Sequence, residues 1–142
     1  RSFPRSIAAD DRFRGLLLRV RELCSDRQLQ ARELSNITYA AAKMSAAGKL
    51  ATNSADVQGT LAALETRAVV VASDMVSQAV GNSIWSYATL GREPGAEAWA
   101  ALEAAVTRVG PEMEPQSAAN ITWGCATLGR MPEAAAWAAL EA

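Results

Sequence analysis

Hydrophobic side chains recur along much of the chain with the spacing of an α-helix. The clearest stripe consists of Trp99, Leu102, Val106 and Val109, at i, i+3, i+7 and i+10. A second stripe of similar spacing consists of Phe13, Leu16, Val20 and Leu23. A further helix is expected around residues 34–44, and no segment favours a strand. The pattern therefore predicts an all-α protein.

Glycine and proline divide these helices into pairs. Gly110-Pro111 should end the helix that begins near Trp99, and Pro115 can open the next one, because a first-turn proline loses no needed N–H. Gly129 suits the position just past that second helix, and Pro132 would open the following one. Gly91 and Pro94 repeat this arrangement, with a glycine that ends one helix and a proline that opens the next.

The pairs repeat with a period of 38 residues. Residues 78–104 align without a gap on residues 116–142, and the matches include Asn82 with Asn120 and Trp85 with Trp123. An earlier copy lies at 31–44, where Asn36 precedes Asn82 by 46 residues, so about eight residues are inserted. The Ala/Gly/Ser/Asn-rich stretch near 46–56 is the expected insertion, a surface loop by composition.

This period predicts an α-solenoid of stacked helical hairpins, because a two-helix unit cannot bury its apolar face alone. We expect an N-terminal extension at 1–12 and repeats at 13–60, 61–98 and 99–136, with the start of a further repeat at 137–142. The chain begins with Arg1 and stops within an expected helix, so we also expect it to be an excerpt of a longer protein.

Charge is distributed unevenly. Residues 1–50 hold ten Arg/Lys and five Asp/Glu, whereas residues 51–142 hold four and ten. A basic N-terminal third could face nucleic acid, or its charges could cover solvated helix faces.

Catalytic chemistry has little support. The chain has no histidine, no glycine-rich phosphate loop and only two cysteines, Cys24 and Cys125, which are expected to be buried apolar side chains. We therefore expect no enzyme activity, no metal and no cofactor, and no apolar run is long enough to cross a membrane.

The unit resembles the octotricopeptide repeat, a 38-residue helical hairpin. The residues that carry the resemblance are Pro115-Gln116, Ala119-Asn120, Trp123, Ala126, Leu128-Gly129, Pro132 and Trp137, with Gln78, Asn82, Trp85, Ala88, Leu90-Gly91, Pro94 and Trp99 in the preceding copy. Tyr39 and Leu61 replace the two tryptophans in earlier copies.

The resemblance implies a function that the spacing itself does not. Such proteins, related to FAST-kinase-like and RAP-domain proteins, are organellar RNA-binding factors that act in mRNA stability, processing or translation. It implies a single-stranded organellar transcript as partner, with protein partners in a ribonucleoprotein complex, and the chloroplast stroma or mitochondrial matrix as the location.

Positions that repeat are expected to build the stack. Trp85, Trp99, Trp123 and Trp137 could stack on bases, but core packing between repeats is favoured for them. Asn36, Asn82 and Asn120 lie mid-helix, where asparagine is unfavourable, so either a buried hydrogen bond, the favoured reading, or an RNA contact should offset the cost.

RNA contacts are sought at arginines and at positions that vary between copies. Arg92 and Arg130 follow the helix-ending glycines, where they could complement the helix dipole or bind phosphate. The variable positions include Glu97 against Ala135 and Glu93 against Met131, and Arg67 and Arg108 supply further charge.

A protein–protein scaffold is the alternative function. Related helical-hairpin arrays are used in this way, and the acidic balance of residues 51–142 favours it, since an RNA-binding surface should be positively charged.

Overall fold

The predicted hydrophobic stripes lie on α-helices in the computed structural model, which describes residues 10–141. Seven α-helices and two 3₁₀ turns occupy this range, and it contains no strand. The helices are α1 (Asp11–Ser25), α2 (Ala31–Ala46), α3 (Ala55–Val71), α4 (Ser77–Leu90), α5 (Ala96–Val109), α6 (Pro115–Leu128) and α7 (Ala134–Glu141). The 3₁₀ turns are Ala72–Asp74 and Gly110–Glu112. The all-α prediction is confirmed.

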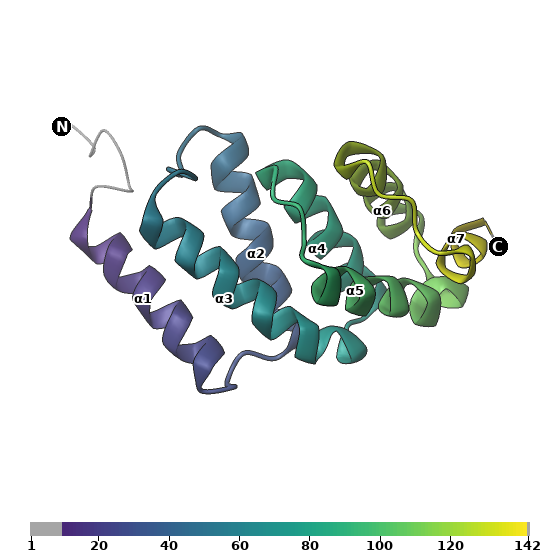
Figure 1. The fold of residues 1–142 in the computed structure, drawn as a ribbon, viewed down its shortest axis with the longest axis horizontal. Coiled ribbons are helices and arrows are strands. Elements are labelled where there is room, and N and C mark those ends of the chain that lie inside the picture. Colours follow the sequence, from purple (N-terminus) through teal and green to yellow (C-terminus); the bar gives the residue numbers. More distant parts are fainter. Residues whose placement is uncertain (1–9, 142) are drawn as a thin grey trace.

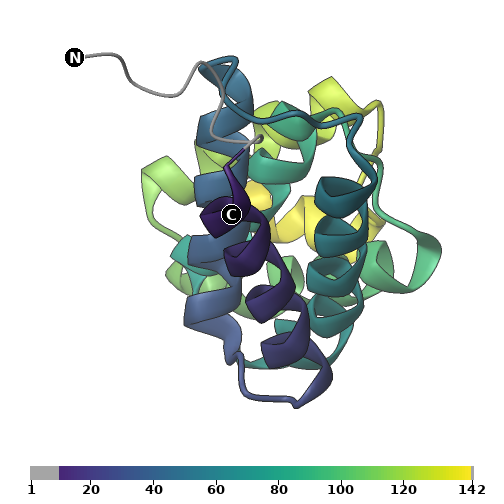
Figure 2. The ribbon, with the colours of Figure 1, turned by 90° about the vertical axis from the view of Figure 1, so that its left-hand side faces the viewer.

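Helices alternate between two rows along the chain (Figure 1). The odd-numbered helices pack on one another in the order α1, α3, α5 and α7, and the even-numbered helices pack in the order α2, α4 and α6. Figure 2 looks at the end of the molecule formed by α1, with α2 and α3 behind it. Within each row, a helix therefore packs against the helix that lies two α-helices later in the sequence.

Local sequence sets most helix ends. Gly91 and Gly129 follow α4 and α6 in the left-handed conformation, with φ of 65° and 69°, which glycine adopts without steric cost. The next N–H, from Arg92 and Arg130, returns to a carbonyl five residues earlier, so each end forms a Schellman motif. Pro115 is the first residue of α6, as predicted.

Two proline predictions were wrong by two residues. Pro94 and Pro132 precede α5 and α7 rather than opening them, and both are buried. The residue that follows each proline instead donates its backbone N–H to a carboxylate on the preceding odd-numbered helix. Glu65 Oε2 accepts from Gly95 N at 3.2 Å, and Glu103 Oε2 accepts from Glu133 N at 2.6 Å. The two carboxylates are 38 residues apart and have the same partner position, so they join helices rather than facing only solvent.

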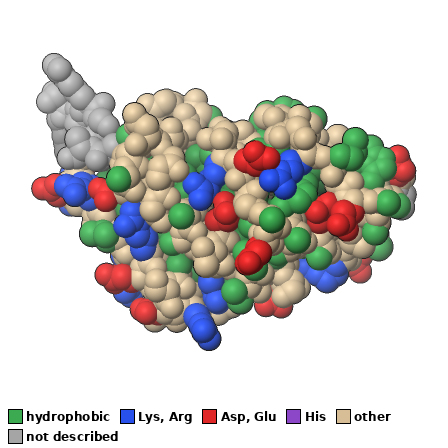
Figure 3. Space-filling model, in the orientation of Figure 1, with side chains coloured by type: hydrophobic (Ala, Val, Ile, Leu, Met, Phe, Trp, Pro, Cys, Tyr) green, Lys and Arg blue, Asp and Glu red, His purple; other side chains and the backbone are tan. Residues whose placement is uncertain are grey.

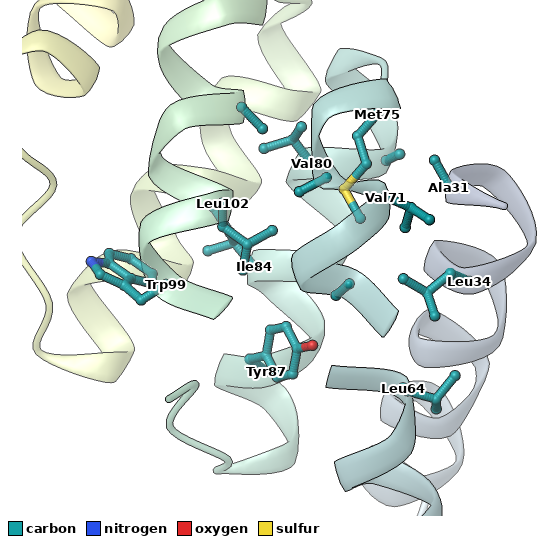
Figure 4. Packing of buried hydrophobic residues seen from close by; sticks show 14 of the residues in the cluster. Ala31, Leu34, Leu64, Val71, Met75, Val80, Ile84, Tyr87, Trp99 and Leu102 are labelled. Atoms are coloured by element: carbon teal, nitrogen blue, oxygen red, sulfur yellow. The ribbon is translucent and has the colours of Figure 1, made fainter. Parts of the chain in front are cut away.

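The hydrophobic core lies between the two rows (Figure 4). Among its most fully buried side chains are Leu34, Leu64, Met75, Ile84 and Leu102. Burial of each such side chain stabilises the folded state by about 1.5–3 kcal/mol relative to leaving it exposed.

Small residues let α4 and α6 approach closely. A Cβ on Gly124 would lie 2.6 Å from Ile84 Cγ2 and 3.1 Å from the Ile84 carbonyl oxygen. A Cβ on Gly81 would lie 3.1 Å from Ser117 Cα. The glycines therefore set the distance between these two helices.

We predict that Gly124→Ala lowers the free energy of unfolding by about 1–3 kcal/mol, because the new methyl group overpacks the α4–α6 contact. The measurement is a urea denaturation curve. The matched control is Gly15→Ala in α1, where nothing lies within 4 Å of the added Cβ. That control should stabilise by up to about 1 kcal/mol through helix propensity. Equal gains from both substitutions would contradict the proposed contact.

Candidate nucleic-acid interface

Each even-numbered helix carries one stripe of residues at i, i+4, i+7 and i+11 that remains outside the core. The stripe consists of Arg32, Asn36, Tyr39 and Lys43 on α2, of Gln78, Asn82, Trp85 and Thr89 on α4, and of Gln116, Asn120, Trp123 and Thr127 on α6. All twelve residues are exposed or half-buried. The spacing follows one helical face, so three stripes of matching chemistry lie on three neighbouring helices.

The aromatic members form a row across these helices. The ring centroids of Tyr39 and Trp85 are 5.2 Å apart, and those of Trp85 and Trp123 are 6.2 Å apart, with interplanar angles of 42° and 34°. Lys43 Nζ lies 5.7 Å from the Tyr39 centroid, within reach of a cation–π interaction. The row therefore combines aromatic surface with one positive charge at the α2 end.

The core assignment of the tryptophans holds for Trp99, which is 7% exposed beneath the Arg130 guanidinium at 5.4 Å. Trp123 and Trp137 are 47% and 37% exposed and so lie outside the core, whereas Trp85 is half-buried and packs between the rings of Tyr39 and Trp123 on the neighbouring helices. Trp85 and Trp123 lie on the outward stripes of α4 and α6 and so form part of the aromatic row, whereas Trp99 of α5 is buried in the core.

The asparagines lie on the surface rather than in buried hydrogen bonds. Asn36 is exposed, and Asn82 and Asn120 are half-buried. Asn120 Oδ1 accepts from Gln116 Nε2 at 3.0 Å within the same stripe. Within the described part of the chain, the side chains of Asn36 and Asn82 have no hydrogen-bond partner. The predicted buried hydrogen bonds are therefore absent at these positions within residues 10–141, and the side-chain amides of Asn36 and Asn82 are unpaired there.

A polar groove of about 400 Å³ separates the first halves of α2 and α4. Asn36 and Asn82 line opposite walls, Arg32 and Gln78 lie near them, and Asp74 supplies a carboxylate. Such a groove can offer donors and acceptors to the edge of a planar, polar group.

Arg67 and Arg108 are used within the fold. Arg67 is 8% exposed, and its Nε donates to the Leu29 carbonyl at 2.8 Å. Arg108 Nη2 donates to the Met75 carbonyl at 2.7 Å. Leu29 and Met75 are equivalent under the 46-residue offset that relates α2 to α4. Both arginines therefore tie an odd-numbered helix to the turn that precedes an even-numbered helix.

Arg92 and Arg130 are also held by neighbouring segments. Arg92 pairs with Glu65 at 3.1 Å, with side chains 22% and 18% exposed. Arg130 pairs with Glu93 at 3.0 Å and donates to the Pro94 carbonyl. These contacts use donors that a phosphate would need.

The variable positions are not brought into the stripes. Glu97 and Ala135 are exposed in the first turn of α5 and of α7, and Met131 is exposed before α7. None of the three lies on an even-numbered helix. The sequence indicated Gln78 and Gln116 only as repeat positions and did not place Arg32 or Lys43 in the candidate site. Their shared spacing relative to the asparagines could have indicated the stripes.

Charged side chains of both signs are interspersed on the face shown in Figure 3. The cysteines remain buried thiols. Burial raises the pKa of Cys24, and burial followed by the nearby Glu103 raises the pKa of Cys125 to about 11. Neither thiol is therefore activated as a nucleophile.

Residues 10–141 contain no cluster of three His, Cys, Asp or Glu side chains that could hold a metal ion. None of their helices combines the length and apolar character that crossing a membrane requires.

We predict that Arg67→Ala lowers the free energy of unfolding by about 1.5–3 kcal/mol, since the buried Leu29 carbonyl and the partly buried Arg27 carbonyl lose a charged donor. Thermal or urea denaturation measures the change. The control is Arg19→Ala, an exposed residue whose pair with Glu22 should contribute no more than about 0.5 kcal/mol. If Arg67→Ala lowers the free energy of unfolding no more than Arg19→Ala does, the proposed role of the Arg67 contact with the Leu29 carbonyl is contradicted.

Comparison of the chain with models of known protein families, with curated proteins and with solved structures finds no match in any of the three.

Proposed function

We propose that this chain is an α-solenoid of stacked helical hairpins that binds single-stranded RNA along its even-numbered helices. The observation that carries the proposal is the aromatic row of Tyr39, Trp85 and Trp123, with an asparagine one turn before each ring. Aromatic rings beside free amides are what proteins use to stack unpaired bases and bind their edges.

Single-stranded RNA fits the row better than a duplex. The rings recur at 5.2 and 6.2 Å, whereas successive bases in a duplex strand are roughly 3.4 Å apart. One nucleotide per even-numbered helix therefore requires a stretched, unpaired strand. A base inserted between two rings would need about twice the 3.4 Å stacking distance, so the bases lie against the outer side of the row.

The cellular role in the proposal comes from the octotricopeptide resemblance. It places the protein in the chloroplast stroma or mitochondrial matrix, acting in mRNA stability, processing or translation by binding rather than by catalysis. The structure supplies a surface on which a transcript could lie.

We predict that Trp123→Ala weakens binding of a labelled unstructured RNA by about 1–3 kcal/mol, the loss typical of one stacked base. Fluorescence anisotropy at low salt measures it. Trp137→Ala is the matched control, because Trp137 is also exposed but lies on α7 and is not part of any stripe. Equal losses from both variants would contradict the proposed surface, and no binding by the unmodified chain would contradict RNA binding itself.

Salt should weaken this binding only moderately. Of the twelve side chains in the stripes, Arg32 and Lys43 carry positive charge. Two phosphate contacts predict a slope of log K against log salt concentration of about −1.4 for a single strand. Titrations between low and physiological salt check the value. A slope steeper than about −4 would mean that arginines outside the stripes bind the phosphates.

A protein–protein scaffold remains the second candidate because of an apolar groove of about 320 Å³ between α1, α2 and α3. Its walls include Leu17, Leu23, Ile37, Met44 and Leu50. Such a groove can accept the apolar face of a partner helix. The RNA titration at low salt separates the two functions, since a scaffold alone gives no affinity.

A further inference from the structure

The four stripe side chains of α4 are the same as the four stripe side chains of α6. Both stripes read glutamine, asparagine, tryptophan and threonine, and α2 keeps the asparagine and an aromatic ring. Helical-repeat proteins that read a mixed sequence use side chains that differ from repeat to repeat. Identical readers on neighbouring helices require the same nucleotide at neighbouring positions.

We infer that the preferred ligand is a run of adenines in an unpaired RNA strand, read at one nucleotide per even-numbered helix. This inference rests on the proposed RNA-binding function and on the same surface. It specifies what that surface selects.

The chemistry of the groove between α2 and α4 favours adenine. A carboxamide offers a donor and an acceptor side by side, which match N7 and the N6 amino group of adenine, whereas guanine presents two acceptors on that edge and takes arginine or lysine. The amides of Asn36 and Asn82 are available for this pairing, because neither has a partner within the described residues.

Asp74 strengthens the preference for a base over a phosphate in this groove. Its carboxylate lines the groove with the two asparagines. A carboxylate accepts hydrogen bonds from an exocyclic amino group and repels a phosphate. Uracil O4 is an acceptor, so it meets a less favourable wall at Asp74 than the adenine amino group does.

The test measures anisotropy of four labelled 12-nucleotide RNAs with the whole chain: oligo(A), oligo(C), oligo(U) and an unstructured mixed sequence. We expect oligo(A) to bind at least about tenfold more tightly than the other three, the scale of one bidentate amide–adenine contact. Asn82→Ala should remove most of that preference, because it weakens binding of oligo(A) much more than binding of oligo(C) or oligo(U). Asn53→Ala, in the exposed segment between α2 and α3, should keep the preference.

The other possible results of this experiment distinguish failure of the adenine inference from failure of RNA binding itself. Equal affinity for all four strands, or tighter binding of the mixed strand, would overturn the adenine inference and leave RNA binding intact. Loss of affinity for every strand in Asn82→Ala, with an unchanged melting curve, would make Asn82 a general contact and overturn its role in selection. If no strand binds, the proposed function fails along with the inference. If Asn82→Ala melts early, the exposed Asn36→Ala gives the same comparison.

Discussion

The close approach of the even-numbered helices is the constraint on which the candidate surface depends. Gly124 leaves room for Ile84, and Gly81 leaves room for Ser117, so α4 and α6 meet with almost no side chain between parts of their backbones. A wider separation would move the rings of Trp85 and Trp123 apart, and the continuous aromatic row would be lost. The same small residues that complete the core therefore also determine the spacing of the surface.

The positive charges of residues 51–142 lie in contacts between neighbouring segments and not on the outward stripes. Arg67, Arg92, Arg108 and Arg130 are the arginines of residues 51–142, and each one donates to a neighbouring segment. Positive charge in this part of the chain thus holds the helices together. The outward stripes of α4 and α6 are neutral, and any ligand there must be bound mainly by stacking and by amide hydrogen bonds.

Much of the fold could be predicted from the sequence because the signals were local. The left-handed glycines, the first-turn proline and the hydrophobic spacing each act within a few residues, and they placed the ends of α4 and α6 correctly. Pro94 and Pro132 were assigned to helix starts because a helix tolerates proline there. The Glu65 and Glu103 carboxylates that hold the residues beyond them come from distant helices, and their contact is not visible in a local pattern.

The candidate surface was harder to predict because repetition has two causes. A position can recur since it packs, as Trp99 does, or since it faces the same kind of ligand in each copy. Spacing alone did not separate these causes for Asn82 or Trp123. The structural contacts of Arg67 and Arg108 could not be predicted either. The two arginines are 41 residues apart and so do not follow the 38-residue period, although they reach equivalent carbonyls.

The carboxylate contacts of Glu65 and Glu103 have a consequence for how motion spreads through the molecule. Each joins one odd-numbered helix to the start of the next, so a local opening is coupled first to the adjacent helix and only through it to those beyond. Amide protons in the middle of the rows should then exchange with solvent more slowly than those near α1 and α7. Bending of the helix rows would therefore be distributed over several contacts between helices rather than concentrated at one hinge.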